Sequence, residues 1–551
     1  MPTIFPYKIN GKQLLIAILL LGAILRFWGL GSAEFFHDEG FYAFRSIGYL
    51  DYIQNDYQTT PIQWFKDLPA LPWWTHLSFH DHPPLFFLIQ NIFFKALGDS
   101  LFIARLPSAL AGIAAIYLAY LLAEKIFQNK ILSLLPAFLL SVNEIHIWIS
   151  RSSLMESFQI FLILLNIFLF FKFIEDYRRW RLFGIILGLS FLTKYTSVFL
   201  LPAYGAYLLI LHRDFFKRRE LYFALGLAAL IFSPVLIYNF YLYKSVGHFD
   251  LQFAYLFKQT TPEWQLSLGK TQDPFSNIIS NLLLLYSIPF LLAAVLSLFY
   301  SIFICARNFR ARAWDRRSQT ILFWLLNFIF VTLMLIKIGS AFRFIALYAV
   351  PAIMLITALF DYLRLKFHQE TIFKVLIAIF LIYESYFASN IFFTFPDFGI
   401  AQLDKYLNFE LGDQRSLAIP ASPNPHLNQI IKDNALLFTP MGKSILIIYD
   451  ENIGLSPRLW LITRRNYYHG IPALTVNQFK NLLKEESTDR FRGYNIYFIK
   501  ASDKTYLNPL YFNPAAQEFE AFLRQQLSLS PEKIIYGYNN LLMFTVYKFS
   551  L

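Results

Sequence analysis

Two adjacent carboxylates, Asp38 and Glu39, follow the first long apolar run of the chain, Leu14–Leu30. That run is long enough to cross a bilayer, so both carboxylates would lie where the chain leaves the membrane. A carboxylate held there could act as a general base or bind a cation. It could equally cap a helix or stay solvated at the interface. Chemistry at this point requires partner groups from other parts of the chain.

A second titratable cluster, His80-Asp81-His82, ends the same loop just before two prolines. Imidazole and carboxylate groups side by side can form an anion site or a metal site. A loop with exposed histidines is the plainer interpretation, and the spacing does not decide between them. The candidate metal ligands are His37, His80, Asp81 and Glu156.

The composition predicts a polytopic α-helical membrane protein. Of 551 residues, 56% are hydrophobic and 15% charged, whereas soluble domains average about 25% charged residues. The one cysteine, Cys305, excludes a disulfide framework and a cysteine-based metal site. We expect about eleven transmembrane helices, at 14–30, 101–123, 131–149, 155–174, 182–193, 196–211, 221–242, 278–304, 319–337, 343–362 and 372–393. The shorter run 84–97 is expected to lie at the membrane surface.

Basic residues fix the expected orientation. They fall in alternate loops between the predicted spans, which makes those loops cytoplasmic by the positive-inside rule. The amino terminus is then cytoplasmic, while the loop 31–100 and everything after about residue 396 lie outside the plasma (inner) membrane. The formal charge of +12 thus reflects topology, and no nucleic-acid partner is expected.

The tail differs in character from the rest of the chain. Short β-rich runs, Ser444–Tyr449, Asn495–Ile499 and Leu542–Phe549, alternate with helical stretches at Val476–Glu486 and Ala515–Leu527. The sequence therefore predicts two domains: a transmembrane domain at 1–395 and a small extracytoplasmic α/β domain at 396–551.

The expected topology brings further ionisable residues to the outer side, where Asp38 lies. Charges at membrane depth are costly and usually functional. Arginine and lysine beside a carboxylate would suit an anionic lipid phosphate next to a general base. These residues are Arg105, Arg151, Glu156, Lys194 and Arg343.

The order of these motifs resembles the GT-C membrane glycosyltransferases of the protein O-mannosyltransferase and aminoarabinose transferase type. The resemblance covers roughly residues 10–365. It rests on the Asp38-Glu39 pair, His82-Pro83-Pro84-Leu85, Arg105-Leu106-Pro107-Ser108-Ala109-Leu110, Ser150-Arg151, Met155-Glu156, Gly188-Leu189, Thr193-Lys194-Tyr195, Ser233-Pro234, Tyr238-Asn239, Arg343 and Pro351.

The resemblance implies a GT-C fold and transfer of a sugar from a polyprenyl-phosphate donor, with inversion, on the outer face. By this analogy Asp38 is the general base and Glu39 orients it or helps bind a cation. The donor phosphate would be bound by His82, Arg105, Lys194, Arg343, Arg151 and Tyr42. A divalent cation is a candidate cofactor. No nucleotide cofactor is expected, and the chain contains no Asp-x-Asp motif of nucleotide-sugar enzymes.

Two departures from the aminoarabinose transferases concern the sugar. Phe41 stands where they have arginine and His82 where they have lysine, which argues against aminoarabinose and favours a mannosyltransferase-like donor. The acceptor stays open among a protein, a lipid-linked glycan and a cell-wall polymer. A transporter or flippase of lipid-linked glycans is the alternative function, although such proteins commonly show internal repeats. A non-catalytic scaffold would leave Asp38 and Glu39 unexplained.

Overall fold

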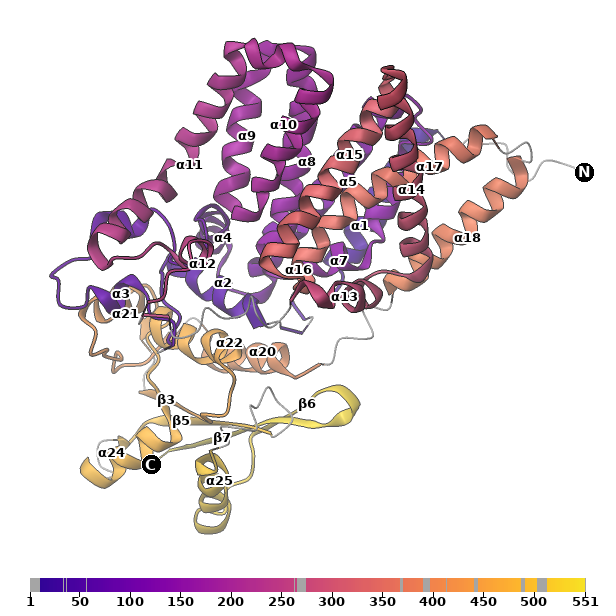
Figure 1. Ribbon diagram of the computed structural model, residues 1–551. Helices are drawn as coiled ribbons and strands as arrows, with labels where there is room; N and C mark the ends of the chain where they lie inside the picture. The colour runs from indigo at the N-terminus through magenta and orange to yellow at the C-terminus, as the bar shows by residue number, and fades with distance from the viewer. Residues whose placement is uncertain are drawn as a thin grey trace, which may run out of the picture.

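The structure is a computed structural model that describes residues 10–32, 34–35, 37–55, 57–261, 263–264, 274–366, 370–389, 397–412, 414–440, 444–486, 491–502 and 513–550. Long helices form one part of the molecule, drawn in the upper half of Figure 1. The strands and the helices beside them form a second part below it, built from the carboxyl-terminal end of the chain. The predicted division into a helical part and an α/β tail is thus visible in the fold.

The helical part is that of a multi-pass membrane protein. Among the described residues, six helical runs are long and apolar enough to cross a bilayer. They are α5 (Leu101–Phe127), α8 (Met155–Glu175), α11 (Arg219–Val246), α14 (Ile288–Ala311), α15 (Arg316–Ile338) and the run Phe342–Lys366, which contains α16 (Phe342–Ile345) and α17 (Ala349–Lys366). The last run is the most buried of the six, while α11 and α14 lie at the periphery and expose apolar side chains to the lipid side.

Four other predicted spans correspond to single helices. They are α1 (Gly11–Phe27), α9 (Trp180–Thr193), α10 (Leu200–Leu211) and α18 (Glu370–Ser389). The predicted interruption at Lys194 is present, since α9 ends there and a short 3-10 turn leads into α10. The number of helices that cross the membrane stays a prediction.

The predicted span 131–149 is not one helix. It forms α6 (Leu134–Ser141) and α7 (Glu144–Arg151). Asn143 caps the start of α7 with its side chain. The guanidinium of Arg26 donates to the carbonyls of the last two residues of α6, at 3.2 and 3.1 Å. The break is therefore stabilised at both ends, because the free backbone groups of each helix find partners.

The predicted span 278–304 is also broken. It forms α13 (Ile278–Leu285) and α14, which are separated by the extended residue Tyr286. The hydroxyl of Ser287 accepts from the backbone N–H of Phe290 at 3.0 Å and caps α14. A proline in the first turn of α14 also favours a helix start at this point.

The tail contains a five-stranded sheet in the order β4-β3-β5-β7-β6. The central strand β5 pairs parallel with β3 and antiparallel with β7. All three predicted β-rich runs are strands of this sheet. The strands are β3 (Ile445–Tyr449), β4 (Ala473–Thr475), β5 (Asn495–Ala501), β6 (Lys533–Tyr536) and β7 (Leu542–Ser550). A separate parallel pair joins β1 (Gln414–Arg415) to β2 (Thr439–Pro440).

The two faces of the sheet are covered by different elements. On one face the helices predicted from the sequence, α24 (Val476–Glu486) and α25 (Ala515–Gln526), bury Phe479 and Phe519 against β3, β5 and β7. On the other face lie α20 (Ile400–Leu411) and a π-helical turn at Leu459–Thr463. Strands β3, β5 and β7 thus bury side chains on both faces, as their nearly continuous apolar sequences require.

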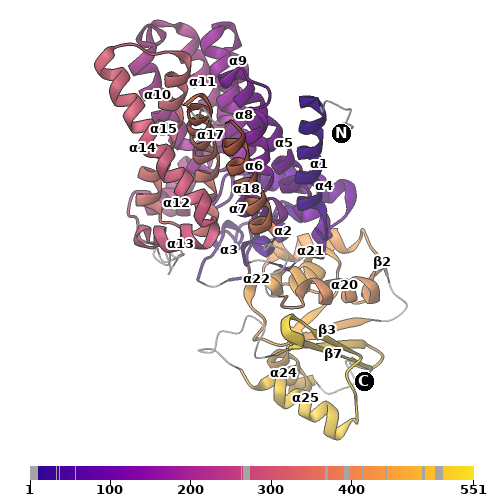
Figure 2. The same cartoon turned by 90° about the vertical axis from the view of Figure 1, so that its right-hand side faces the viewer.

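The second face of the tail sheet also packs on the loop 31–100. One apolar core joins Phe35, Ala43 and Phe94 of that loop to Leu403 and Trp460 of the tail. Phe35 and Trp460 stack with their ring centroids 5.9 Å apart. Figure 2 shows the tail directly below α2 (His37–Gly48) and α4 (Leu85–Leu97). The boundary predicted at 395–396 falls outside the described residues, so the division there stays a proposal.

Candidate functional site

Helix α2 directs its polar side chains to two different places. Asp38, Tyr42 and Arg45 recur at helical spacing, which puts them on one face, and all three line a cavity. Glu39 is rotated by about 100° from its neighbour and is fully buried in the protein interior. The two adjacent carboxylates therefore have different surroundings.

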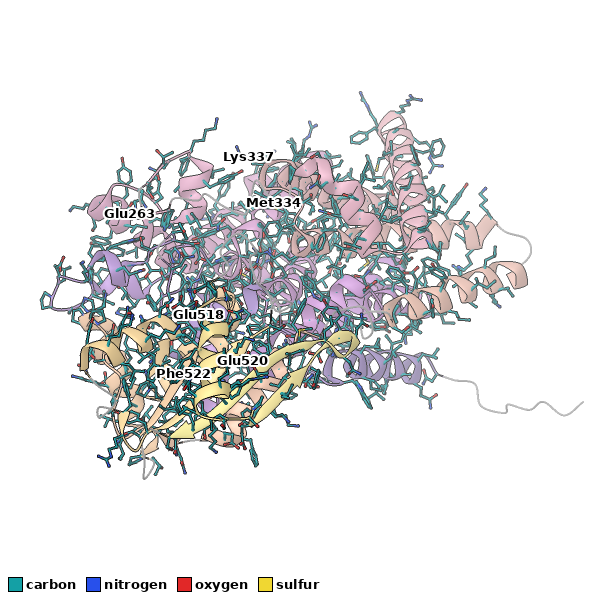
Figure 3. All side chains as sticks on the ribbon, turned by 90° about the horizontal axis from the view of Figure 1, so that it is seen from below. Glu263, Met334, Lys337, Glu518, Glu520 and Phe522 are labelled. Carbon is teal, nitrogen blue, oxygen red and sulfur yellow. The ribbon has the colours of Figure 1, made fainter. Side chains whose placement is uncertain are left out.

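The cavity has a volume of about 420 Å³, within the usual range of about 300–1,000 Å³ for small-molecule sites. Its polar wall holds six of the predicted residues: Asp38, Tyr42, Asp81, His82, Lys194 and Arg343. Its apolar wall includes Val198, Phe253, Leu256, Met334, Ile338 and Phe344. Met334 and Lys337, at the end of α15, are labelled in Figure 3. A site with one charged and one apolar wall suits an amphiphilic ligand.

Arg343 connects the charged groups of the cavity. Its guanidinium forms an ion pair with Asp38, and its Nη1 donates to the hydroxyl of Tyr42 at 3.1 Å. Its Nε lies 3.6 Å from Oε1 of Glu156. The side chains of Arg343 and Asp38 are 24% and 39% exposed, so both can be reached from the cavity.

Lys194 supplies a second positive charge on the same wall. Its ammonium pairs with the buried carboxylate of Glu156 and lies 4.7 Å from the ring centroid of Phe344. Glu156 was a candidate metal ligand, but here it is the counter-ion of Lys194 and Arg343. Lys194 and Arg343 thus place two cationic groups beside the cavity, and such groups can bind an anion there.

A chain of polar contacts continues from Tyr42 away from Arg343. The Tyr42 hydroxyl lies 3.2 Å from Nε2 of His82, and Nδ1 of His82 lies 2.9 Å from Oδ2 of Asp81. Burial lowers the pKa of His82 and outweighs the neighbouring carboxylate, so the imidazole is neutral near pH 7. A neutral His82 contributes a hydrogen-bonding group to the cavity and no net positive charge.

Arg45, which lines the cavity, lies between two buried carboxylates. Its Nη2 donates to Asp81 at 2.6 Å and to Asp51 at 2.7 Å. Burial opposes ionisation of Asp81, but the charge of Arg45 holds the pKa of the Asp81 carboxyl well below its usual range. Both carboxylates are thus ionised and paired.

The predicted metal ligands are brought together only in part. Potential ligand atoms of Asp51, His80 and Asp81 lie within 4.8 Å of one another. However, the guanidinium of Arg45 already provides the positive charge among these oxygens, so a divalent cation would have to displace it. Glu156 belongs to the Lys194 pair, and the side chain of His37 lies outside the described residues. The set predicted from the sequence is therefore not a single cation site.

Glu39 and Arg105 form a structural ion pair, contrary to their predicted roles. Nε of Arg105 donates to Glu39 Oε2 at 2.8 Å, and both side chains are fully buried. Arg105 also donates to the carbonyls of Leu30 and Glu34, each at 2.8 Å. The backbone N–H of Ser153 donates to Glu39 at 2.8 Å. Neither residue lines the cavity, since burial of the pair directs both toward the helix interfaces.

Arg151 is likewise remote from the cavity. Its Nη1 donates to the carbonyls of Leu25, Arg26 and Trp28, the last at 2.7 Å. These carbonyls lie at the carboxyl-terminal end of α1, where they lack partners within the helix. Arg151 therefore stabilises the end of α1, and we withdraw it as a phosphate ligand.

Arg45 and Asp51 were not predicted as site residues from the sequence. Arg45 follows Asp38 by seven residues, so helical spacing alone could have placed it on the same face of α2. Lys337 lines the cavity from the last turn of α15. The role of Asp51 carries no such signal, because it depends on how the loop folds back toward His80.

Comparison with known proteins places this site in a known fold. Residues 81–238 match the family described as dolichyl-phosphate-mannose-protein mannosyltransferase. YkcB of Bacillus subtilis (strain 168), a protein named as a mannosyltransferase, is 29% identical over 153 residues, which are 27% of this chain. The match spans only 21% of the length of that relative.

The overall structure is similar to that of ArnT from Cupriavidus metallidurans. For the apo form the TM-score is 0.52 at 12% sequence identity, with 98% of each chain covered. For the form bound to undecaprenyl phosphate the TM-score is 0.50 at 11% identity, with the same coverage. At such low identity the similarity establishes the fold, including the helical part and the tail.

Proposed function

From its GT-C fold and the charges around its cavity, we propose that the chain is an integral membrane glycosyltransferase. It moves a sugar from a polyprenyl-phosphate donor to an acceptor hydroxyl of a protein, a lipid-linked glycan or a cell-wall polymer. The observation that carries the proposal is the Asp38–Arg343 pair, which brings a carboxylate and a guanidinium to one cavity. The reaction occurs at the outer face of the plasma membrane, with the amino terminus in the cytoplasm and the tail outside.

The proposed reaction uses each charge in a defined way. Asp38 takes the proton of the acceptor hydroxyl as its oxygen attacks the anomeric carbon from the face opposite the phosphate. The bond between that carbon and the phosphate oxygen breaks, and polyprenyl phosphate departs with the electron pair. The configuration at carbon is inverted. Arg343 and Lys194 stabilise the negative charge that develops on the phosphate, which lowers the barrier more than it favours the ground state.

The paired state of Asp38 suggests an order of events. In the free protein Arg343 pairs with Asp38 and also contacts Tyr42. A donor phosphate competes for the guanidinium and leaves the carboxylate with weaker interactions. The Asp38 carboxylate is then available to accept a hydrogen bond from the acceptor hydroxyl. Donor binding would in this way prepare the base.

Donor turnover tests the proposal. The purified protein in lipid nanodiscs is offered a panel of radiolabelled polyprenyl-phosphate sugars, with envelope extract as acceptor, and release of label from the lipid is followed. Wild type should consume one donor, and Asp38→Asn should not. Asp67→Asn is the matched control, because Asp67 is an exposed carboxylate of the same loop. The proposal would be contradicted if Asp38→Asn consumed the donor at the wild-type rate. It would also be contradicted if the wild type consumed none of the donors.

A further inference from the structure

Three large apolar side chains stand out from the tail. Phe409, Leu436 and Leu437 are 84%, 68% and 79% exposed, and we call them the apolar tip. Phe409 is in the last turn of α20, and the two leucines directly follow α21 (Pro425–Ala435). Exposed apolar groups of this size usually mark a contact with a partner or a membrane.

The parallel pair β1–β2 brings these residues to one place. Gln414 pairs with Thr439 and Arg415 with Pro440. Because the two strands run in the same direction, the segments that lead into them meet at the same end of the pair. Phe409 precedes β1, and the two leucines precede β2, so the apolar tip is formed by both segments.

Both segments of the tip contact the stretch Arg464–His469, which also binds Asp99. Next to Phe409, the side chain of Asn408 accepts from Nη2 of Arg465 at 2.6 Å. Next to Leu437, Phe438 stacks on His469 with the ring centroids 4.7 Å apart. His469 Nε2 in turn lies 2.7 Å from Oδ2 of Asp99. Arg464, the neighbour of Arg465, also pairs with Asp99, at 3.4 Å.

Asp99 lies where the membrane surface is expected from the start of the apolar span α5. It lies between the end of α4 at Leu97 and the start of the apolar span α5 at Leu101. The flanking side chains Leu97 and Phe102 are 58% and 40% exposed, and Ile92 on the outer face of α4 is 53% exposed. The lipid-facing surface of the helical part therefore reaches the point to which the apolar tip is anchored.

We propose that the apolar tip inserts into the outer membrane interface beside α4 and fixes the tail domain against the lipid. The exposed Lys405 and Lys432 each precede the tip by one helical turn. Their position allows the ammonium groups to reach lipid phosphates while the stems lie along the apolar surface. The partner of the apolar tip is thus the lipid bilayer, the same bilayer that we expect to contact α4 and α5.

Site-specific fluorescence tests this contact in the full-length protein. In a Cys305→Ser background, which removes the one native cysteine, Leu437→Cys is labelled with an NBD fluorophore. The protein is then reconstituted into vesicles with or without nitroxide-labelled lipids. Phe522→Cys is the matched control, because Phe522 is also an exposed apolar residue, 49% exposed, but lies on α25 on the opposite face of the sheet (Figure 3).

We expect blue-shifted NBD emission at position 437 and quenching of at least twofold by nitroxide lipids, with water-like, unquenched emission at position 522. Emission at 437 that resembles that of a fluorophore in water would overturn the proposal. Blue-shifted emission without quenching by lipid would also overturn it, since the tip would then be covered by protein. Label release from the donor does not enter this test, so its outcome is independent of the proposed catalytic function.

Discussion

Arg343 and Asp38, which are 305 positions apart in the sequence, form an ion pair beside the cavity. The contact joins the start of α2 to the start of the run that contains α16 and α17. It places a carboxylate suited to proton transfer next to a cation suited to a phosphate. Substitutions of these two residues and of their neighbours can distinguish the residues that act in the reaction from those that stabilise the fold.

Replacing Arg343 should slow turnover strongly. Loss of one preorganised group that stabilises developing negative charge typically costs about 100- to 1,000-fold in rate, so we expect a decrease of this order in kcat for Arg343→Ala. Arg343→Lys should retain part of the activity because it keeps the charge. Initial rates of label release in nanodiscs measure both. Arg310→Ala, an exposed arginine in the last turn of α14, should behave as wild type.

Glu39→Gln should act on stability, whereas Asp38→Asn should act on turnover. Removing one partner of a buried ion pair costs about 3–5 kcal/mol, and Glu39 is paired with Arg105 in the interior. Thermal unfolding in detergent should show a clearly lower Tm for Glu39→Gln and a nearly unchanged Tm for Asp38→Asn. A Glu39→Gln protein with wild-type Tm and no turnover would restore Glu39 to the catalytic set.

Arg45→Gln should also destabilise the protein. The substitution leaves the ionised carboxylates of Asp51 and Asp81 without the guanidinium that now lies between them, at a cost of about 3–5 kcal/mol. Millimolar Mn²⁺ should partly restore the Tm of this variant, because its oxygens could then bind a cation. It should leave the wild-type Tm unchanged. Arg178→Gln, in an exposed turn, is the control. A Tm increase of the wild type with Mn²⁺ would show that a cation does displace Arg45.

Stability should fall as the pH rises through the titration of Glu34. Burial, followed by a hydrogen bond with Asp397, raises the pKa of Glu34 from 4.5 to about 8. Because the pKa is higher in the folded than in the unfolded state, protonated Glu34 stabilises the folded protein. This stabilisation is fully present below about pH 4.5 and is lost as the pH rises toward 8. The stabilisation by Glu34 is a few kcal/mol at most, since a pKa difference of one unit corresponds to about 1.4 kcal/mol.

Tm measurements between pH 5 and 8 check this expectation. The wild-type Tm should decrease across the range, and Glu34→Gln should flatten that decrease because it carries no titrating proton. Glu485→Gln, at an exposed position of α24, should keep the wild-type slope. Equal slopes for all three proteins would mean that Glu34 titrates alike in the folded and unfolded states.

Several features were readable from local sequence. Short, nearly continuous apolar runs indicated β3, β5 and β7, because strands that are buried on both faces have such sequences. The long apolar runs at α5, α8 and α15 required helices, because a bilayer leaves no other partner for the backbone. The breaks near Asn143 and Ser287 were missed because their flanks are equally apolar. The capping contacts that stabilise them come partly from distant Arg26.

The membrane class, the α/β tail and the residues able to do chemistry could be predicted from composition and periodicity, because these are local properties. Which of these residues act together depends on the fold. The fold turned Asp38 toward the cavity and Glu39 toward Arg105. It also placed Arg45 between Asp51 and Asp81, of which only Asp81 had been predicted as a metal ligand. A charge pattern cannot reveal such pairings, because the free energy of an ion depends on its burial and on partners that are distant in sequence.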